Sequence, residues 1–305
     1  MMKVFCSCSW GQHSRLFFYK AMLLAFLLLF FSHAFSPPLK ANDGQERSFD
    51  IPRLPQRIVS LVPTVTEELY LLGVGDKVVG VTVYCHRPPE AQTKEKVGTV
   101  VDVNIEKIIE LRPDLVIASP LTDHKQTRKL RDIDVEVEIF YEAKDFQGLC
   151  ENFLRLSQLV GAERKAEKIV EKAKRELEAV KKRIEGIAKS KVFVQIGANP
   201  LFTADGGSFF NDLIECAGGI NIAGDAKTGI FSREEVIKRD PDIILIVTMG
   251  IVGQKEKEVW LRYKTINAVK NHRIFTLDSY RVCSPTPVSF VETVKELVEI
   301  FHAQQ

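Results

Sequence analysis

Short, unbroken apolar runs alternate with amphipathic segments along most of the chain. An apolar run of four to eight residues predicts a strand buried on both faces, and the segments between the runs have the period of helices. Strands and helices that alternate in this way are typical of parallel sheets covered on both sides. The sequence therefore predicts an α/β protein, with strands at 57–62, 78–83, 115–119, 135–141, 192–197, 243–247 and 274–278.

One helix–strand unit occurs twice. Residues 104–119 align without a gap on residues 232–247, and each copy begins with a residue that favours a helix N-cap, Asn104 or Ser232. Each copy then passes through a Pro-Asp pair and enters an apolar run, which ends the helix and starts a strand. The repeat predicts two related Rossmann-like lobes, each a mostly parallel sheet flanked by helices.

Both copies of the repeat carry a glutamate in the first helical turn, Glu106 and Glu234. The positive end of the helix dipole favours a carboxylate at this position, so both side chains could serve only to stabilise their helices. The alternative is that two matched lobes present two matched carboxylates to a partner with two matched cations.

The segment between the lobes is helical over 146–160 and again over 163–188. Apolar residues cover one side of the second stretch and charged residues cover the other. At ~1.5 Å per residue this helix would be about 38 Å long, enough to connect two lobes. A coiled coil is the competing interpretation.

In the N-terminal lobe, Thr64 and Glu67 have the spacing of a capping box for the first helix.

The first 34 residues have the pattern of a signal peptide. Three basic residues precede the apolar run 21–31, and the small residues Ser32 and Ala34 follow it. The run is too short for a membrane-spanning helix, which needs about 20 residues. We therefore expect export to the periplasm. The expected division is a signal peptide at 1–34, a lead-in at 35–56, an N-terminal lobe at 57–145, a helical connector at 146–190 and a C-terminal lobe at 191–305.

The net charge and the cysteine spacing bear on which partners and metal sites to expect. The whole chain has a net charge of +2, and removal of the three basic residues of the leader leaves 39 Lys+Arg against 40 Asp+Glu. This balance gives no electrostatic reason to expect a nucleic acid or an anionic membrane as partner. Four cysteines follow the leader and could pair in three ways or stay as buried thiols, and none has the CxxC spacing of a zinc site. They are Cys85, Cys150, Cys216 and Cys283.

Candidate binding residues follow the strands, because ligands of open parallel sheets bind beyond the carboxyl ends of the strands. Aromatic rings with a few charged groups in these loops indicate a mid-sized organic ligand in a cleft between the lobes. Each ring could equally be a packing residue, and Asp278 could simply pair with Arg281. His86 and His124 lack neighbouring carboxylates at a spacing suited to a metal, so no metal site is expected. The candidates are Tyr84, His86, Phe202, Asp278, Tyr280 and Arg281.

Three common motifs of enzymes do not occur in the chain: there is no G-x-S-x-G, no H-E-x-x-H and no P-loop, and the Ser, His and Asp residues form no recognisable nucleophilic set. We therefore expect a protein that is not an enzyme. The alternative from another class is a two-lobed enzyme that uses a nucleotide, which would need a glycine-rich phosphate loop after a strand.

Five segments in the same order resemble the periplasmic cobalamin-binding proteins of ABC importers, within a family that also contains binders of ferric siderophores and haem. They are RIVSLVPTVTE (57–67), YCHRPPEA (84–91), VFVQIGANPLFT (192–203), CAGGINI (216–222) and SREE (232–235). The resemblance covers nearly all of the chain after the leader. It implies a monomeric binding protein without a cofactor of its own, with two lobes joined by a long helix, that delivers cobalamin or another corrinoid to a membrane permease.

The resemblance also implies roles for individual residues. Tyr84 and Phe202 would contact the cargo with their rings, Asp278 and Arg281 would make polar contacts, and Glu106 and Glu234 would dock on arginines of an ABC permease dimer. The chain departs from the family pattern where a cobalamin binder has tryptophans, at Val100, at Ser119 and near Gly229 and Ile230. Trp260 is its one tryptophan after the leader. The stacking surface is therefore thinner, which leaves another corrinoid, haem or a siderophore as alternative cargo. The family's cysteine partner for Cys216 is also absent.

Overall fold

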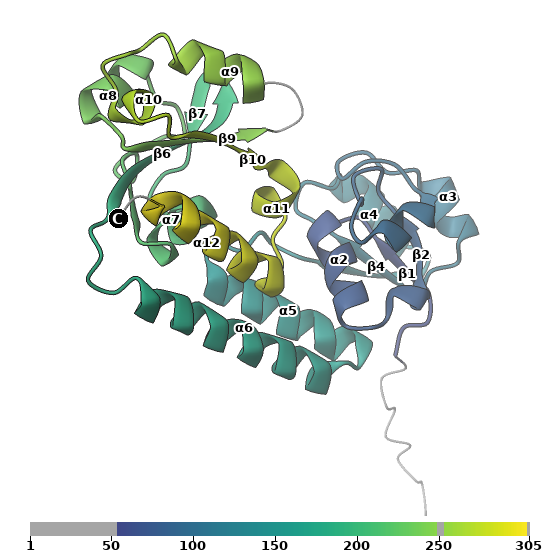
Figure 1. Ribbon diagram of the computed structural model, residues 1–305. Coiled ribbons are helices and arrows are strands. Elements are labelled where there is room, and N and C mark those ends of the chain that lie inside the picture. Colours follow the sequence, from purple (N-terminus) through teal and green to yellow (C-terminus); the bar gives the residue numbers. More distant parts are fainter. Residues whose placement is uncertain (1–53, 249–252, 304–305) are drawn as a thin grey trace, which may run out of the picture. The chain divides into compact units, whose positions relative to one another are not determined.

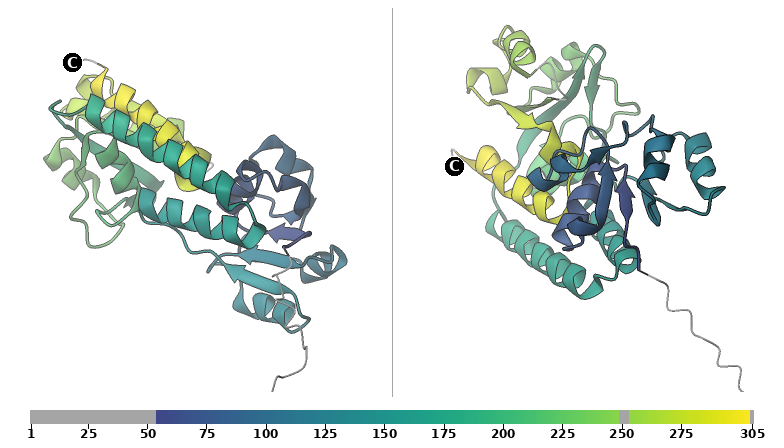
Figure 2. Two further views of the ribbon diagram at one scale, coloured as in Figure 1. Left: turned by 90° about the horizontal axis from the view of Figure 1, so that it is seen from below. Right: turned by 90° about the vertical axis from the view of Figure 1, so that its right-hand side faces the viewer.

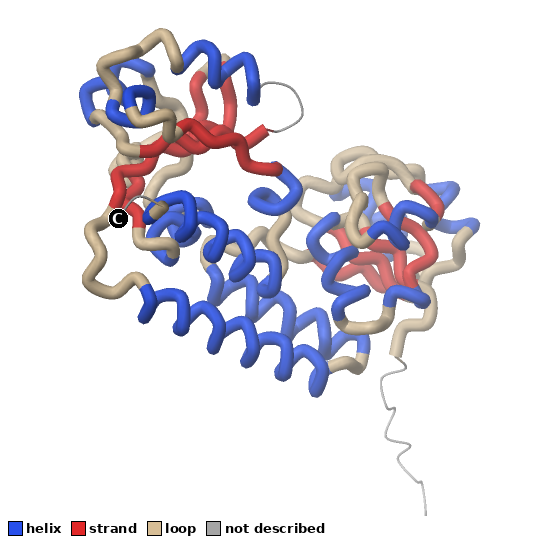
Figure 3. Tube along the Cα trace, in the orientation of Figure 1, coloured by secondary structure: helices blue, strands red, loops and turns tan. Residues whose placement is uncertain are grey.

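The computed structural model describes residues 54–248 and 253–303, shown in Figures 1 and 2. The expected signal peptide and nearly all of the lead-in lie outside the described residues. Within the described part of the chain, none of the helices is both long and apolar enough to cross a membrane. The strands form two separate sheets, coloured red in Figure 3, as the duplicated pattern predicts.

The N-terminal sheet has five parallel strands in the order β3-β2-β1-β4-β5. Its central strands are buried on both faces, because Ile58 and Ile117 belong to one apolar cluster and Val59 and Val116 belong to another. The strands are β1 (Ile58–Ser60), β2 (Val78–Val81), β3 (Glu95–Lys96), β4 (Leu115–Ala118) and β5 (Glu136–Ile139). The α-helices are α2 (Pro63–Leu71), α3 (Ile105–Glu110) and α4 (His124–Arg131), with 3-10 turns η1 (Gly75–Lys77) and η2 (Pro89–Thr93).

The C-terminal sheet has the order β10-β9-β6-β7, and β8 also pairs with β6. All of its pairings are parallel except β6 with β7. The strands are β6 (Ser190–Ala198), β7 (Leu201–Thr203), β8 (Gly219–Asn221), β9 (Ile243–Thr248) and β10 (Ile274–Asp278). The helices are α7 (Phe209–Cys216), α8 (Arg233–Arg239), α9 (Gly253–Trp260), α10 (Asn267–Lys270) and α11 (Ser279–Cys283).

The repeated sequence unit is a repeated structure. Asn104 caps α3 by accepting the Lys107 N–H at 2.9 Å, and Ser232 caps α8 by accepting the Glu235 N–H at 3.1 Å. The aspartate of each Pro-Asp pair then binds the start of the neighbouring strand. Asp114 accepts the backbone N–H of Arg57 at 2.9 Å. Asp242 accepts that of Lys191 at 2.8 Å. The duplication therefore preserves the contacts that set strand β4 against β1 and β9 against β6.

Three helices make a layer that packs on both lobes: α5 (Phe146–Val160), α6 (Glu163–Arg183) and α12 (Pro287–His302). Helix α6 packs against α5 and α12, and α5 also contacts α2 of the N-terminal lobe. Figure 2 shows α6 running beside α12. One apolar cluster continues from Ile58 through Phe153 and Leu177 to Val192. The layer therefore joins the lobes through a continuous core, which resists local opening.

Two details differ from the sequence-based prediction. Helix α6 ends at Arg183 and not at residue 188, because the chain turns at Gly186, whose φ of 79° belongs to the left-handed region. The capping box is wrong. Helix α2 begins at Pro63, before Thr64 can act as its N-cap, and its N-cap Val62 makes no side-chain hydrogen bond. The cysteines at 85, 150, 216 and 283 are all free thiols.

Candidate functional site

Exposed apolar side chains gather beyond the carboxyl edge of the N-terminal sheet. Because the strands of this sheet are parallel, the loops that follow them leave the sheet on the same side. Val83 and Tyr84 follow β2, Val101 follows β3, Leu121 follows β4 and Tyr141 follows β5. These residues are between 41% and 70% exposed. Apolar side chains so placed are free to contact a ligand.

Hydrogen bonds between loops hold this surface together. The backbone N–H of Val83, after β2, donates to the carbonyl of Gly98, after β3, at 2.9 Å. The hydroxyl of Thr122, after β4, donates to the carbonyl of Val100 at 2.8 Å. The three loops are thus cross-linked to one another, which fixes the spacing of the apolar side chains that they carry.

The C-terminal lobe contributes a second apolar group. Strand β6 ends at Ala198 and the chain returns as β7, where Phe202 is 42% exposed. Phe202 forms a β-bridge with Ile230, which is 54% exposed. A Cβ atom on Gly197 would lie 2.9 Å from the Phe202 ring, so the glycine leaves room for the ring. We call the exposed residues of both lobes the apolar rim: Val83, Tyr84, Val101, Leu121, Tyr141, Phe202 and Ile230.

Helix α11 brings polar candidates from β10 to the loop after β2. Asp278 caps α11 by accepting the Tyr280 N–H at 2.9 Å, and Arg281 belongs to the same helix. The Tyr280 hydroxyl donates to the carbonyl of Tyr84 at 3.2 Å. The rings of Tyr280 and His86 meet edge to face, with centroids 5.0 Å apart. The structure therefore brings Tyr84, His86 and Tyr280 together, while Phe202 lies in the separate group with Ile230.

The two repeated glutamates occupy equivalent places in the two lobes. Glu106 is exposed in the first turn of α3, and Glu234 is exposed in the first turn of α8. Each helix leads into a strand of its parallel sheet, so its N-terminus lies toward the carboxyl edge of that sheet. A hydrogen bond from its own backbone N–H, followed by one from the Ser232 hydroxyl, lowers the pKa of Glu234. Glu234 is therefore an exposed anion at neutral pH.

A buried polar network supports the start of α8. Arg233 donates to the Glu256 carboxylate at 2.8 Å, and Gln195 of β6 donates to the same carboxylate oxygen at 2.7 Å. The indole N–H of Trp260 donates to the Gln195 side-chain oxygen at 2.6 Å, and Trp260 is fully buried. Trp260 therefore belongs to the core beneath Arg233, the residue next to Glu234. It is not a stacking surface for a ligand.

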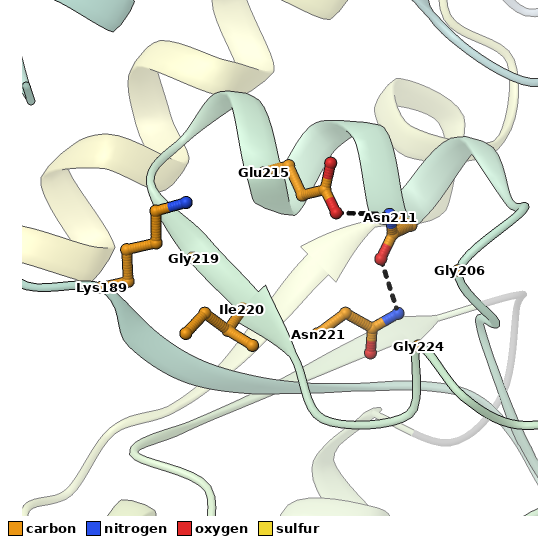
Figure 4. A pocket seen from close by; sticks show the side chains of 8 residues that line it. All are labelled: Lys189, Gly206, Asn211, Glu215, Gly219, Ile220, Asn221 and Gly224. Atoms are coloured by element: carbon orange, nitrogen blue, oxygen red, sulfur yellow. Dashed lines mark hydrogen bonds between the residues drawn. The ribbon is translucent and has the colours of Figure 1, made fainter.

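A pocket of about 300 Å³ lies between α7 and β8 (Figure 4), and its lining shares no residue with the apolar rim. The Asn221 amide donates to the Asn211 side-chain oxygen at 3.2 Å, and the Asn211 amide donates to Glu215 at 2.9 Å. These amides are engaged with one another, so the pocket is held by its own hydrogen bonds. Its lining is Lys189, Gly206, Asn211, Glu215, Gly219, Ile220, Asn221 and Gly224.

Sequence patterns did not indicate Val83, Val101, Leu121, Tyr141 or Ile230 as ligand contacts. Each except Ile230 stands within six residues of a strand's carboxyl end, and apolar residues at such positions are the signal that could have found them. His124 is well exposed and lies near Asp123, with 3.9 Å between His124 Nδ1 and a carboxylate oxygen. Among the described residues, no group of three His, Cys, Asp or Glu side chains could hold a metal ion.

Comparison with known proteins identifies the family. Residues 58–281 match the family model described as periplasmic binding protein. The chain belongs to this periplasmic binding protein family. An uncharacterized ABC transporter substrate-binding lipoprotein of Bacillus subtilis, YvrC, is 33% identical over 86% of this chain and 85% of its own length. As a member of this family, the protein is a substrate-binding protein of the ABC importer type, a class of transport proteins that are not enzymes.

Solved structures of periplasmic binding proteins share the two-lobed fold. The periplasmic vitamin B12-binding protein BtuF of Vibrio cholerae is 27% identical, covers 81% of this chain and 96% of its own, and has a TM-score of 0.68. A possible iron-binding, periplasmic solute-binding protein of Staphylococcus epidermidis is 30% identical, covers 81% of this chain and 98% of its own, and has a TM-score of 0.72.

Proposed function

We propose that this protein binds cobalamin or a related corrinoid between the carboxyl edges of its two sheets and delivers it to an ABC permease. The observation that carries the proposal is the apolar rim, because its exposed side chains come from both lobes and stand where ligands of parallel sheets bind. A corrin ring is a broad, flat system with largely apolar faces. Rings such as Tyr84 and Phe202 would pack on these faces without needing a precise polar match.

The edge of a corrin carries amide groups, which need hydrogen-bond partners when they leave water. Tyr280, His86, Asp278 and Arg281 are the polar residues that we assign to them. Three of these lie in α11 or directly before it, so one short helix would present them together. A largely apolar site usually orients its ligand through a few polar groups that are held in fixed directions.

Two cargoes compete in this proposal. The likeness to BtuF, which is named as a vitamin B12-binding protein, supports a corrinoid. The likeness to the Staphylococcus epidermidis protein, named as possibly iron-binding, supports a ferric siderophore or haem as the second candidate. The exposed phenols of Tyr84 and Tyr141 favour this second candidate, because a phenolate oxygen is a ligand that haem iron accepts in proteins.

We assign the docking on the permease to Glu106 and Glu234. Their equivalent positions in the two lobes support contact with a symmetric partner, such as a permease dimer that offers one arginine from each half. Close charge pairs at interfaces couple by ~1.5 to 7 kcal/mol, so two such pairs would be enough to set the orientation of docking. Export to the periplasm through the segment 1–34 belongs to the same proposal, and N-terminal sequencing of the secreted protein tests it.

The decisive experiment is calorimetric titration of the purified protein with cyanocobalamin and, separately, with hemin. We expect one cyanocobalamin per chain with a dissociation constant below about 1 μM, which corresponds to about 8 kcal/mol of binding free energy, and much weaker binding of hemin. Calorimetry is preferable to tryptophan fluorescence because Trp260 is buried in the core. Tight binding of hemin without binding of cyanocobalamin would replace the first candidate by the second.

A further inference from the structure

Arg87 of the N-terminal lobe binds the backbone of the C-terminal lobe. Its Nη2 atom donates to the carbonyl of Tyr280 at 2.7 Å, and the carbonyl of Ser284 lies at the outer limit of hydrogen bonding, 3.5 Å away. Both carbonyls belong to α11 or to the residue that follows it, 193 and 197 positions further along the chain.

The same Nη2 atom lies 3.0 Å from the carboxylate of Glu67 in helix α2. The two side chains are only 28% and 19% exposed, so water screens this pair less than it screens a surface ion pair. Burial raises the pKa of Glu67, Arg87 lowers it, and the nearby Glu292 of α12 raises it. Arg87 thus neutralises a carboxylate that burial and a second acid would otherwise destabilise, which ties its position to α2 as well as to α11.

A second hydrogen bond runs in the opposite direction. The Tyr280 hydroxyl of the C-terminal lobe donates to the carbonyl of Tyr84 at 3.2 Å, and the ring of Tyr280 packs edge to face on His86. The loop that carries Tyr84, His86 and Arg87 is therefore bound to Tyr280 through the backbone of each side. A displacement of α11 from this loop would break both bonds at once.

We propose that Arg87 and Glu67 form an interlobe latch, a pair of positioning residues that holds α11 against the loop after β2. The latch keeps Tyr84 and Tyr280 at one spacing in the free protein, so that the site is already formed when the cargo arrives. Its effect on affinity is indirect, because preorganised contacts spare the binding free energy that ordering them would consume. The inference rests on the proposed function for the identity of the cargo, and on the contacts of Arg87, Glu67 and Tyr280 for the latch itself.

The test compares Arg87→Met, Glu67→Gln and the double variant with a matched control, Arg273→Met. Arg273 also donates through Nη2 to two carbonyls near a helix end, those of Ile300 at 2.9 Å and Phe301 at 2.8 Å, but all three residues belong to the C-terminal lobe and its closing helix. Three quantities are measured for each variant: the dissociation constant for cyanocobalamin, the melting temperature, and amide hydrogen exchange of the free protein.

We expect each single latch variant to bind cyanocobalamin about tenfold more weakly, because Arg87→Met loses a hydrogen bond from a charged group to the Tyr280 carbonyl and Glu67→Gln loses the ion pair that positions Arg87. The double variant should bind about as weakly as the weaker-binding of the two single variants, because both substitutions break the same latch. Exchange should become about tenfold faster in peptides that cover 84–92 and 279–286, with peptides of β4 unchanged. Arg273→Met should lower the melting temperature and leave both the affinity and these two peptides as in the wild type.

Two results would overturn the latch. The first is a loss of cyanocobalamin affinity that follows the drop in melting temperature in every variant, Arg273→Met included. The second is amide hydrogen exchange of the peptides 84–92 and 279–286 that is the same in Arg87→Met as in the wild type. The exchange measurement needs no cargo. If the wild-type protein fails to bind cyanocobalamin, the proposed cargo is wrong, and the exchange of the free variants still decides whether the latch exists.

Discussion

Replacement of Phe202 by alanine should weaken corrinoid binding about 30-fold. Phe202 is 42% exposed, and a phenylalanine contributes roughly 200 Å² in all, so about 80 Å² of apolar surface is open to a ligand. Covering that area yields about 2 kcal/mol at 25 cal/mol per Å², and 2 kcal/mol corresponds to a factor of about 30 in the dissociation constant.

The assay is calorimetric titration of wild type and variants with cyanocobalamin, with melting temperatures measured in parallel. Ile187→Ala is the matched control, because Ile187 is 37% exposed but precedes β6, at the opposite end of the strand from Phe202. Gly197→Ala is a second perturbation of the same ring. Its new Cβ would lie 2.9 Å from the ring carbon of Phe202, so the ring must move, and affinity should fall although Phe202 is still present.

The reasoning would be refuted by a Phe202→Ala protein that binds cyanocobalamin as tightly as the wild type. It would also be refuted by an equal loss of affinity in Ile187→Ala, because the effect would then come from general destabilisation and not from contact with the ligand.

Three further predictions address docking, pH and helix capping. The double variant Glu106→Arg/Glu234→Arg should bind cyanocobalamin normally and abolish uptake in a strain that depends on this protein. The control Glu110→Arg, at the other end of α3, should support normal uptake. Normal uptake with the double variant would refute the docking assignment. Burial raises the pKa of Glu68 well above its ordinary value of 4.5, so the folded state binds the Glu68 proton more tightly than the unfolded state does. The stability that this proton contributes at low pH is therefore lost as the pH rises above 4.5. Urea unfolding should therefore show that Glu68→Gln gains stability relative to wild type as the pH rises above 4.5. A stability difference that is independent of pH would contradict the raised pKa of Glu68. Ser232→Ala removes the cap of α8 and should lower the free energy of unfolding by about 1 kcal/mol, and an unchanged value would show that the cap is not needed.

The sequence predicted those parts of the fold that local patterns encode. The duplicated unit succeeded because Asn104, Ser232, Asp114 and Asp242 each act on backbone groups a few residues away or at the start of a neighbouring strand, so the same residues recur wherever the same contacts are needed. Apolar runs likewise marked the central strands, because burial on both faces favours apolar residues. Buried polar residues such as Gln195 of β6 are exceptions that hydrogen bonds satisfy.

Contacts between residues that are distant in sequence could not be predicted in the same way. Nothing near Arg87 indicates that it binds the carbonyl of Tyr280, since the two residues are 193 positions apart and each carries an ordinary local pattern. Glu67 was placed in a capping box on local spacing alone, but Pro63 starts the helix earlier and the carboxylate pairs with Arg87. The roles of single residues in ligand binding and docking are still predictions.

A hydrogen-exchange footprint of bound cyanocobalamin tests the central claim most directly. If a corrinoid binds between the two carboxyl edges, it should slow exchange in the loops of both lobes that carry the apolar rim, 83–84, 100–103, 119–123, 140–143, 199–203 and 229–231. The segments 132–135 and 185–189, which precede β5 and β6, should exchange as in the free protein. Protection confined to one lobe, or found only in those preceding segments, would contradict the account.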